Sequence, residues 1–153
     1  MQLAASFRNP ITIRSERPLS DEQIIQIAPS IFARDKHYSC SGRYAHIPTS
    51  MILRGLRNEG FEPFMVCQSR VRDEGRREYT KHMIRLRHAS QIDGEEANEI
   101  VLLNSHDGSS SCQMMAGMFR FVCANQMVCG DALDAIIEGL YRARLFRGGR
   151  RAA

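Results

Sequence analysis

The stretch FMVCQSRVRDEGRREYTKHMIRLRH, residues 64–88, predicts a β-hairpin at the centre of the fold. Side chains alternate between two faces from residue 64 to residue 69, and the charged, glycine-containing segment 72–77 predicts the turn. On the return strand, alternation separates a basic face from a largely apolar face. The basic face holds Tyr79, Lys81, Met83, Arg85 and Arg87, and the other face holds Thr80, His82, Ile84 and Leu86. We expect the basic face to be exposed to solvent.

Two helices are predicted before the hairpin. Ser20 and Gln23 form a capping-box pattern, and the apolar spacing that follows is helical as far as Pro29, which bends or ends the helix. A second helix begins at Pro48, and Gly60 suits its C-cap. The apolar face of this second helix consists of Ile52, Leu53 and Leu56.

The chain after the hairpin predicts further strands and a last helix. Residues 99–103 form an apolar run of the length of a central strand. Residues 111–128 predict one or two strands, broken near Gly117 and Asn125. Residues 131–146 have apolar residues at helical spacing and predict a closing helix.

Together these elements predict an α+β fold: a single domain with an antiparallel sheet of about four strands, two N-terminal helices and one C-terminal helix. The length of 153 residues and the 43% hydrophobic content suit one domain with its own core. The domain spans residues 20–146, after an arm at 1–19 that Pro10 and Pro18 interrupt, and before a basic tail at 147–153. The predicted core includes Ile52, Leu56, Ile100, Leu102, Phe121 and Ile136.

The charge balance permits an anionic partner. Lys and Arg number 21 against 17 Asp and Glu, and all of the 21 except Lys36 and Lys81 are arginines. The planar guanidinium fork suits phosphates and stacked bases better than an ammonium does. The five cysteines have no C-x-x-C spacing, which argues against structural zinc, and no segment has the length of a signal peptide or membrane span. We therefore expect the cytoplasm of a bacterial host and no membrane partner.

Arginines and aromatic residues mark the predicted contact surface. Lys81, Arg85 and Arg87 would repeat at multiples of about 7 Å, close to the phosphate step of an extended single strand. The alternative is a solvated face paired with the nearby carboxylates Asp73, Glu74 and Glu78. The polar loop 37–46 adds aromatic and basic side chains that suit stacking on bases. The candidate binding residues are Arg70, Arg72, Arg76, Arg77, Tyr79, Lys81, Arg85, Arg87, Arg43 and Tyr44.

The segment NSHDGS, residues 104–109, suggests either a catalytic site or a tight turn. Adjacent extended residues point to opposite faces, so His106 and Asp107 cannot act as an orienting pair without a bend. We favour an Asp-Gly turn, with Asn104 and Asp107 bonded to the backbone and Gly108 at positive φ. Metal binding by His82, His106, Asp107 and Cys112 would need a tertiary convergence. We therefore predict no catalytic residues, no metal and no cofactor.

Three strings carry a family resemblance: RVRDEGRREYTKHM at 70–83, LLNSHDG at 102–108 and GMFRFVCAN at 117–125. They resemble the phage- and plasmid-encoded family catalogued as domain of unknown function 932, which includes YubP-like proteins. The resemblance runs from about Arg17 to Gly130. It implies an origin in a mobile element, with the C-terminal part of typical members truncated here, and it implies no established activity.

The sequence supports three classes of function. The first is a non-enzymatic accessory protein that binds nucleic acid, most simply single-stranded, or a host nucleoprotein complex. The second is an inhibitor of host defence, such as an anti-CRISPR or antirestriction protein, acting by protein contact. Its only acidic cluster, Glu95, Glu96 and Glu99, is small for a mimic of DNA. A metal-dependent nuclease ranks third, because no carboxylate spacing for a metal is evident.

Overall fold

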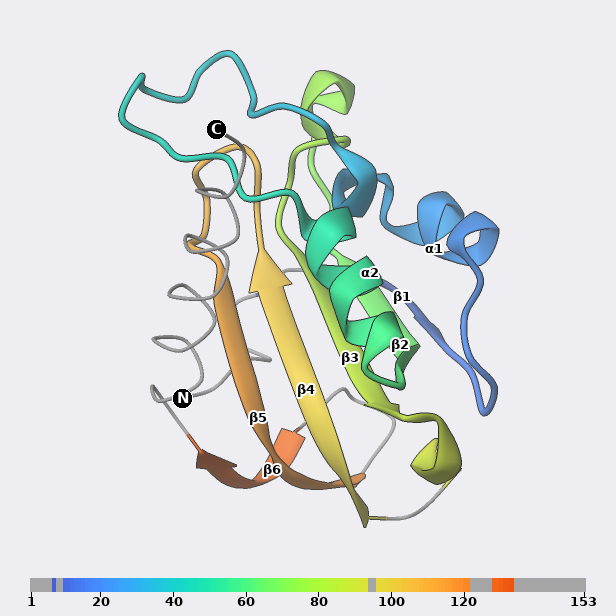
Figure 1. Ribbon diagram of the computed structural model, residues 1–153. Coiled ribbons are helices and arrows are strands. Elements are labelled where there is room, and N and C mark those ends of the chain that lie inside the picture. The colour runs from blue at the N-terminus through green and yellow to red at the C-terminus, as the bar shows by residue number, and fades with distance from the viewer. Residues whose placement is uncertain (1–6, 8–9, 94–95, 122–127, 134–153) are drawn as a thin grey trace.

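The computed structural model describes residues 7, 10–93, 96–121 and 128–133. Six strands form one antiparallel sheet in the order β1 to β6, so that each strand pairs with its neighbours along the chain (Figure 1). The strands are β1 (Ile11–Arg14), β2 (Phe61–Gln68), β3 (His82–His88), β4 (Glu96–Asn104), β5 (Gln113–Phe121) and β6 (Val128–Leu133). The helices are α1 (Asp21–Ile27) and α2 (Thr49–Asn58), with the short 3-10 helices η2 (Pro29–Phe32), η3 (Glu74–Arg76) and η4 (Ala89–Gln91).

Both N-terminal helices begin and end where the sequence predicts. The Ser20 hydroxyl accepts from the Gln23 amide at 3.3 Å, and the Gln23 side chain accepts from the Ser20 amide at 3.0 Å, which completes the capping box. Pro29 then starts η2. After α2, Gly60 takes a φ of +89°, and a Cβ there would lie 2.9 Å from Nε2 of His88. Glycine is therefore favoured at this helix end by its backbone conformation, and a Cβ there would also displace the His88 ring.

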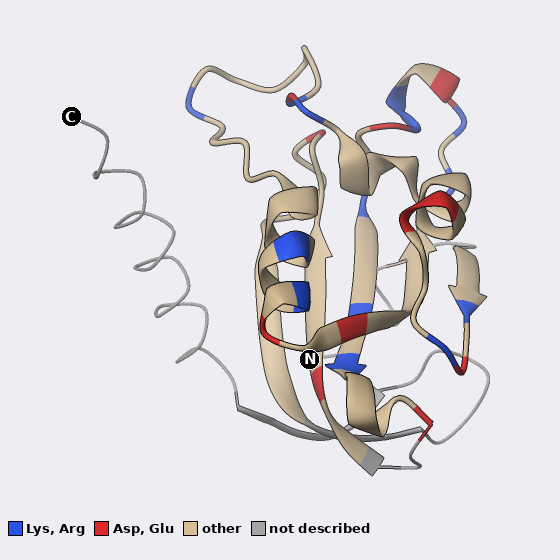
Figure 2. Cartoon of the chain, turned by 45° about the vertical axis from the view of Figure 1, so that its right-hand side comes forward, with Lys and Arg blue, Asp and Glu red and all other residues tan. Residues whose placement is uncertain are grey.

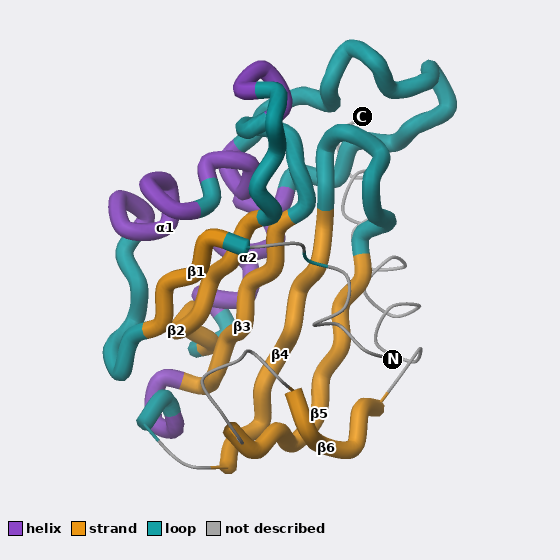
Figure 3. The backbone as a smooth tube through the Cα atoms, turned by 180° about the vertical axis from the view of Figure 1, so that it is seen from behind, coloured by secondary structure: helices purple, strands orange, loops and turns teal. Residues whose placement is uncertain are grey.

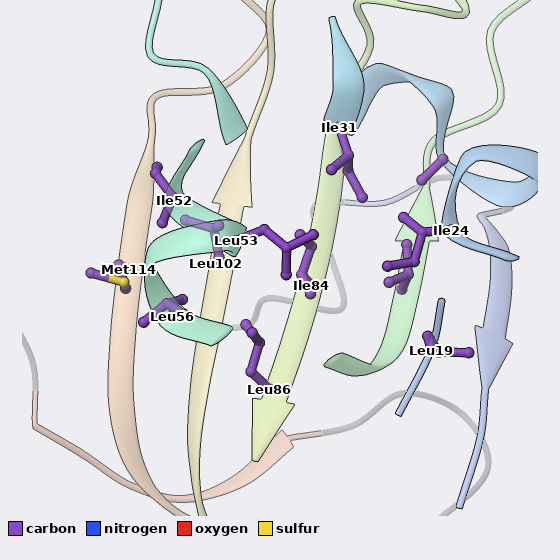
Figure 4. Close-up of a cluster of buried hydrophobic side chains, with 12 residues drawn as sticks. Leu19, Ile24, Ile31, Ile52, Leu53, Leu56, Ile84, Leu86, Leu102 and Met114 are labelled. Carbon is purple, nitrogen blue, oxygen red and sulfur yellow. The ribbon is translucent and has the colours of Figure 1, made fainter. Parts of the chain in front are cut away.

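The helices cover one face of the sheet, and the main core lies between the helices and this face (Figures 1 and 4). Leu53 of α2 lies beside Ile84 of β3, whereas Ile24 of α1 lies over β2, and all three belong to one buried cluster (Figure 4). Ile52, Leu56 and Leu102 are buried as predicted, and Ile100 is half-buried against the same cluster. No helix among the described residues is long and apolar enough to cross a bilayer.

The α+β prediction with one antiparallel sheet is confirmed, but the predicted strand number was too low. The arm at 1–19 contains β1, which Pro10 and Pro18 flank rather than interrupt, because an edge strand tolerates proline at its ends. β5 runs unbroken through Gly117, which pairs with Glu99 on one side and Ala132 on the other. The predicted last helix is wrong at residues 131–133, which belong to β6. The other predictions for this part of the chain lie outside the described residues: the rest of the last helix, the break near Asn125, the Phe121 and Ile136 side chains and the tail at 147–153.

The second face of the sheet, seen in Figure 3, is also buried along its central strands. Met83, Val101, Leu103 and Met115 form a cluster there that Phe7 joins from the N-terminal segment. A further cluster joins Phe64 and Met65 to Ile92, which follows η4. Because β3 and β4 are buried on both faces, their alternation does not separate an inside from an outside.

Candidate functional site

The loop between β2 and β3, residues 69–81, is the arginine-rich loop, and its backbone is held by hydrogen bonds. Ser69 donates to the Lys81 carbonyl at 2.9 Å and closes the base of the loop. The Asp73 carboxylate accepts from the Gly75 amide at 2.9 Å and caps η3. At its end the loop is tied to the domain, because the His106 amide donates to the Tyr79 carbonyl at 2.8 Å. The loop thus presents its side chains from a fixed backbone.

Four arginines of this loop are exposed, as a contact surface requires: Arg70, Arg72, Arg76 and Arg77. Arg76 lies 3.9 Å from the Asp73 carboxylate, an ion pair at the limit of contact between two exposed groups. Such a pair contributes only about 0–1 kcal/mol and leaves the guanidinium open to a stronger partner. Glu74 and Glu78 are also exposed, and Figure 2 shows basic and acidic segments intermingled at this end of the molecule.

The prediction that Arg85 and Arg87 are exposed is wrong. Both are completely buried and bind the equally buried carboxylate of Glu99 on β4. Nε of Arg85 donates to Oε2 of Glu99 at 2.8 Å, and Nε of Arg87 donates to Oε1 at 2.7 Å. The Nη2 atoms lie at 2.7 and 2.6 Å from the same two oxygens. Neither arginine is available to a phosphate, so both leave the set of candidate binding residues.

Strand register explains this charge cluster, defined as Arg85, Arg87 and Glu99. Arg87 pairs directly with Glu99, and Arg85 lies two residues along the same face of β3. A β-bulge in β2 shifts the register between Pro63 and Met65, and the Phe64 ring lies against both guanidinium groups. Its centroid is 5.3 Å from Cζ of Arg85 and 4.7 Å from Cζ of Arg87. Arginine tolerates such burial because its charge is delocalised and weakly hydrated.

The remaining predicted binding residues are only partly accessible, apart from Arg43. Lys81 is half-buried, with Nζ 5.9 Å from the centroid of the Phe7 ring. Tyr79 is half-buried with its ring edge-on to His37, at 5.2 Å between centroids. Tyr44 donates its hydroxyl hydrogen to the Ser105 carbonyl, and burial raises the pKa of this phenol. Arg43 is exposed on the long loop 33–48.

A buried polar network lies beneath that long loop, at the end of the sheet where β4 ends. His82 Nδ1 lies 3.0 Å from the Thr80 carbonyl, so this nitrogen carries the proton of the neutral ring. Nε2 then accepts from the Thr49 hydroxyl at 2.8 Å. Thr49 in turn accepts from the Asn104 amide at 3.0 Å. Ser30 completes the network with contacts of 2.7 Å to His82 and to Gln68. These bonds fix a neutral histidine inside the protein.

The turn at 104–109 has the geometry that the sequence predicts. Gly108 takes a φ of +80°, the Asp107 carboxylate accepts from the Ser109 amide at 2.9 Å, and the Asn104 side chain accepts from the Ser105 amide at 2.9 Å. The fold does bring His106 to His82, with 5.3 Å between ring centroids. Within the described ranges, however, no group of three or more His, Cys, Asp and Glu side chains is arranged to hold a metal.

We expect the protein to lose stability as the pH falls from 7.5 to 5. Burial is the main cause that lowers the pKa of His82 to about 3, whereas a histidine of the unfolded chain titrates near 6.5. The unfolded state therefore binds more protons in this interval, and stability falls with pH. At about 1.36 kcal/mol per pKa unit, His82 alone removes about 2 kcal/mol by pH 5.

Urea unfolding at pH 7.5, 6 and 5 measures this effect. A free energy of unfolding that stays constant over this range would contradict a neutral buried His82.

Sequence patterns missed a second group of polar residues, which lines a cavity of about 300 Å³ between η2 and α2. Arg34, Ser50 and Arg54 contribute to its walls. Arg34 follows η2, whereas Ser50 and Arg54 lie on α2, so only the packing of these two helices brings the three together. The spacing of Ser50 and Arg54, one helical turn apart on one face, was the only local signal for this group.

The amino-acid sequence of the chain is similar to those of known proteins. The chain is 50% identical over 152 residues to the UPF0380 proteins YafZ and YfjQ, both of Escherichia coli strain K12. Each match covers 92% of this chain and 56% of the relative, so the chain spans a little over half the length of these curated relatives. No solved structure matches. Residues 36–138, which include the arginine-rich loop, the charge cluster and most of the histidine network, match the family described as Domain of unknown function (DUF932), and the chain belongs to that family.

Proposed function

We propose that this chain is a non-enzymatic accessory protein of a mobile element that binds single-stranded nucleic acid through the arginine-rich loop. The observation that supports this most is the exposure of Arg70, Arg72, Arg76 and Arg77 on a loop whose backbone is fixed at both ends. Because the backbone is already held, binding phosphate oxygens orders only the arginine side chains and not the loop. Such contacts position a strand without reading its bases.

A binding role suits the chemistry better than a catalytic one. Among the described residues, His82, Ser30 and Thr49 form the hydrogen-bonded cluster that most resembles a catalytic group, and all three are completely buried. A substrate has no access to these groups, whereas the arginines lie at the surface. The network stabilises the end of the sheet from which the arginine-rich loop projects.

Salt dependence of binding tests the proposal. Association with a 12-nucleotide single-stranded DNA, followed by fluorescence anisotropy, should weaken as salt rises, with a log–log slope of about 0.7 per neutralised phosphate. Four arginines would give a slope of about 3. Arg72→Ala with Arg76→Ala should lower that slope by about 1.4 and should weaken all sequences equally.

Arg17→Ala is the control, because this exposed arginine follows β1 at the end of the sheet away from the loop, as the pairing of Arg14 with Met65 shows. It should leave the salt slope unchanged. Equal binding by the parent and by the double variant, or binding without salt dependence, would refute the nucleic-acid proposal.

A second candidate, an inhibitor of host defence that acts by protein contact, is favoured by exposed apolar side chains. Tyr38 on the long loop is 91% exposed and Met51 on α2 is 60% exposed. Exposed aromatic residues often anchor protein interfaces. The burial of Glu99 removes one carboxylate from the predicted acidic cluster, so the contact would be made by these side chains and not by mimicry of DNA. A partner protein that copurifies after nuclease treatment, and that Tyr38→Ala releases, would favour this candidate.

A further inference from the structure

The cleft between η2 and α2 contains one arginine that is held by carboxylates and two arginines that are exposed. Arg57 donates to the Asp21 carboxylate at 2.5 Å and to the Leu19 carbonyl at 3.0 Å, and its Nε lies 3.4 Å from the Glu62 carboxylate of β2. The Arg57–Asp21 pair neutralises the Asp21 carboxylate at the wall of the cleft. Arg34 and Arg54 are exposed at the same cavity, and neither forms an ion pair with any residue that the structure describes.

The charge of the cleft matches one phosphate group. Once the Arg57–Asp21 pair is set aside, Arg34 and Arg54 leave two positive charges at a cavity of about 300 Å³. A phosphate monoester carries a charge of about −1.5 to −2 at pH 7. Each guanidinium can donate two parallel hydrogen bonds to phosphate oxygens, and the Ser50 hydroxyl at the same wall can donate a further one.

The cavity has room for more than phosphate, and its neighbour suits an attached sugar or base. Phe32 lines it and also lines an adjoining cavity of about 340 Å³, which extends to Tyr79 at the end of the arginine-rich loop. Arg34 is likewise shared by the two cavities. Aromatic rings and arginine planes are the groups on which bases stack. The second cavity also contains the carboxylates of Asp35 and Glu78, which disfavour a second phosphate there.

We propose that the η2–α2 cleft binds the phosphate group of a nucleotide, with Arg34 and Arg54 as its principal ligands. The phosphate could belong to a free mononucleotide or to a nucleic-acid strand, and in the second case the inference rests on the proposed function and supplies a second contact beyond the arginine-rich loop. Figure 2 shows basic segments on α2. The loop that follows η2 and the arginine-rich loop lie at the same end of α2.

Isothermal titration calorimetry at low salt tests the cleft with adenosine 5′-monophosphate, adenosine and inorganic phosphate. The parent should bind the monophosphate at least about tenfold more tightly than adenosine, since adenosine lacks the phosphate oxygens that accept charged hydrogen bonds from the two arginines. Arg34→Ala with Arg54→Ala should lower the affinity for the monophosphate by at least about tenfold. Arg54→Lys keeps the charge but loses the planar guanidinium fork, so its affinity for the monophosphate should lie between the affinities of the parent and of Arg54→Ala.

Arg72→Ala with Arg76→Ala is the matched control, because it removes the same charge from the arginine-rich loop and should leave the affinity for the monophosphate unchanged. Thermal unfolding of each variant confirms folding, and the exposure of all four arginines predicts unchanged midpoints. The same variants are then titrated with the 12-nucleotide DNA to identify the source of the phosphate.

The outcomes separate the two proposals. Loss of monophosphate binding in the cleft variant, Arg34→Ala with Arg54→Ala, supports the cleft as a phosphate site. If the parent does not bind the DNA at all, the phosphate belongs to a free nucleotide and the proposed function fails. Weaker DNA binding in the cleft variant identifies the strand as the source. If the cleft variant binds both probes as the parent does, and the loop variant, Arg72→Ala with Arg76→Ala, no longer binds the DNA, the proposal for the cleft is wrong and the proposed function stands. Absence of any effect of the cleft variant on either probe also overturns the proposal for the cleft.

Discussion

Glu99→Gln is expected to destabilise the protein by about 3–5 kcal/mol, the usual cost of removing one partner from a buried ion pair. The carboxylate of Glu99 neutralises two completely buried guanidinium groups, those of Arg85 and Arg87. An amide of the same size can accept hydrogen bonds but carries no charge. The two positive charges would then be held close together in a medium where desolvation is costly. Urea unfolding monitored by circular dichroism measures the loss.

Glu59→Gln is the matched control, because Glu59 is exposed at the end of α2 and should change the free energy of unfolding by less than about 0.5 kcal/mol. A triple replacement of the charge cluster by methionine and leucine should recover much of the stability that Glu99→Gln loses, since apolar residues of similar volume avoid the desolvation of charge. A loss below about 1 kcal/mol for Glu99→Gln would show that the carboxylate does not neutralise both arginines.

Leu102→Ala should destabilise the protein by about 2–5 kcal/mol. Leu102 is completely buried at the centre of the main core, on β4 beneath α2 (Figure 4). Truncation removes buried apolar surface and leaves a cavity that the closely packed helices and strands cannot fill. The midpoint of urea unfolding should fall while the slope of the transition stays constant.

Met51→Ala is the comparison for this truncation, because Met51 lies on the outer side of α2 and is 60% exposed. It should cost less than about 0.5 kcal/mol. If Leu102→Ala cost below about 1 kcal/mol, the assignment of β4 to the centre of the core would be wrong.

Local patterns predicted the parts of the fold that local chemistry determines. The capping box at Ser20, the positive φ of Gly60 and Gly108, and the β2–β3 hairpin all follow from interactions between residues close in sequence. Alternation also predicted which side chains of β3 share a face. It could not show that a second layer covers the basic face, because that depends on Phe7 of the N-terminal segment and on the path of the chain after η4, which brings Ile92 to Phe64 and Met65.

The charge cluster and the cleft show why the candidate site was only partly predictable. An arginine at every second position normally indicates a solvated strand, and only the register of β4 places Glu99 opposite Arg87 and within reach of Arg85. In the cleft, Arg34 and Arg54 come from separate elements, and no spacing rule joins them before the helices pack. In contrast, the exposed arginines at 70–77 were identified correctly as surface residues because the glycine-containing turn keeps them away from the sheet.

The strand order of the sheet has a consequence for how the chain folds. Since every strand pairs with its immediate neighbour in sequence, none of the connections passes another strand, although the connection from β1 to β2 contains both helices. Closing a longer loop adds only about 0.6 kcal/mol for each doubling of its length, so the arginine-rich loop can lengthen or shorten during evolution with little change in the free energy of the folded state. The chemistry of this loop could therefore diversify while the sheet continues to assemble in the same order.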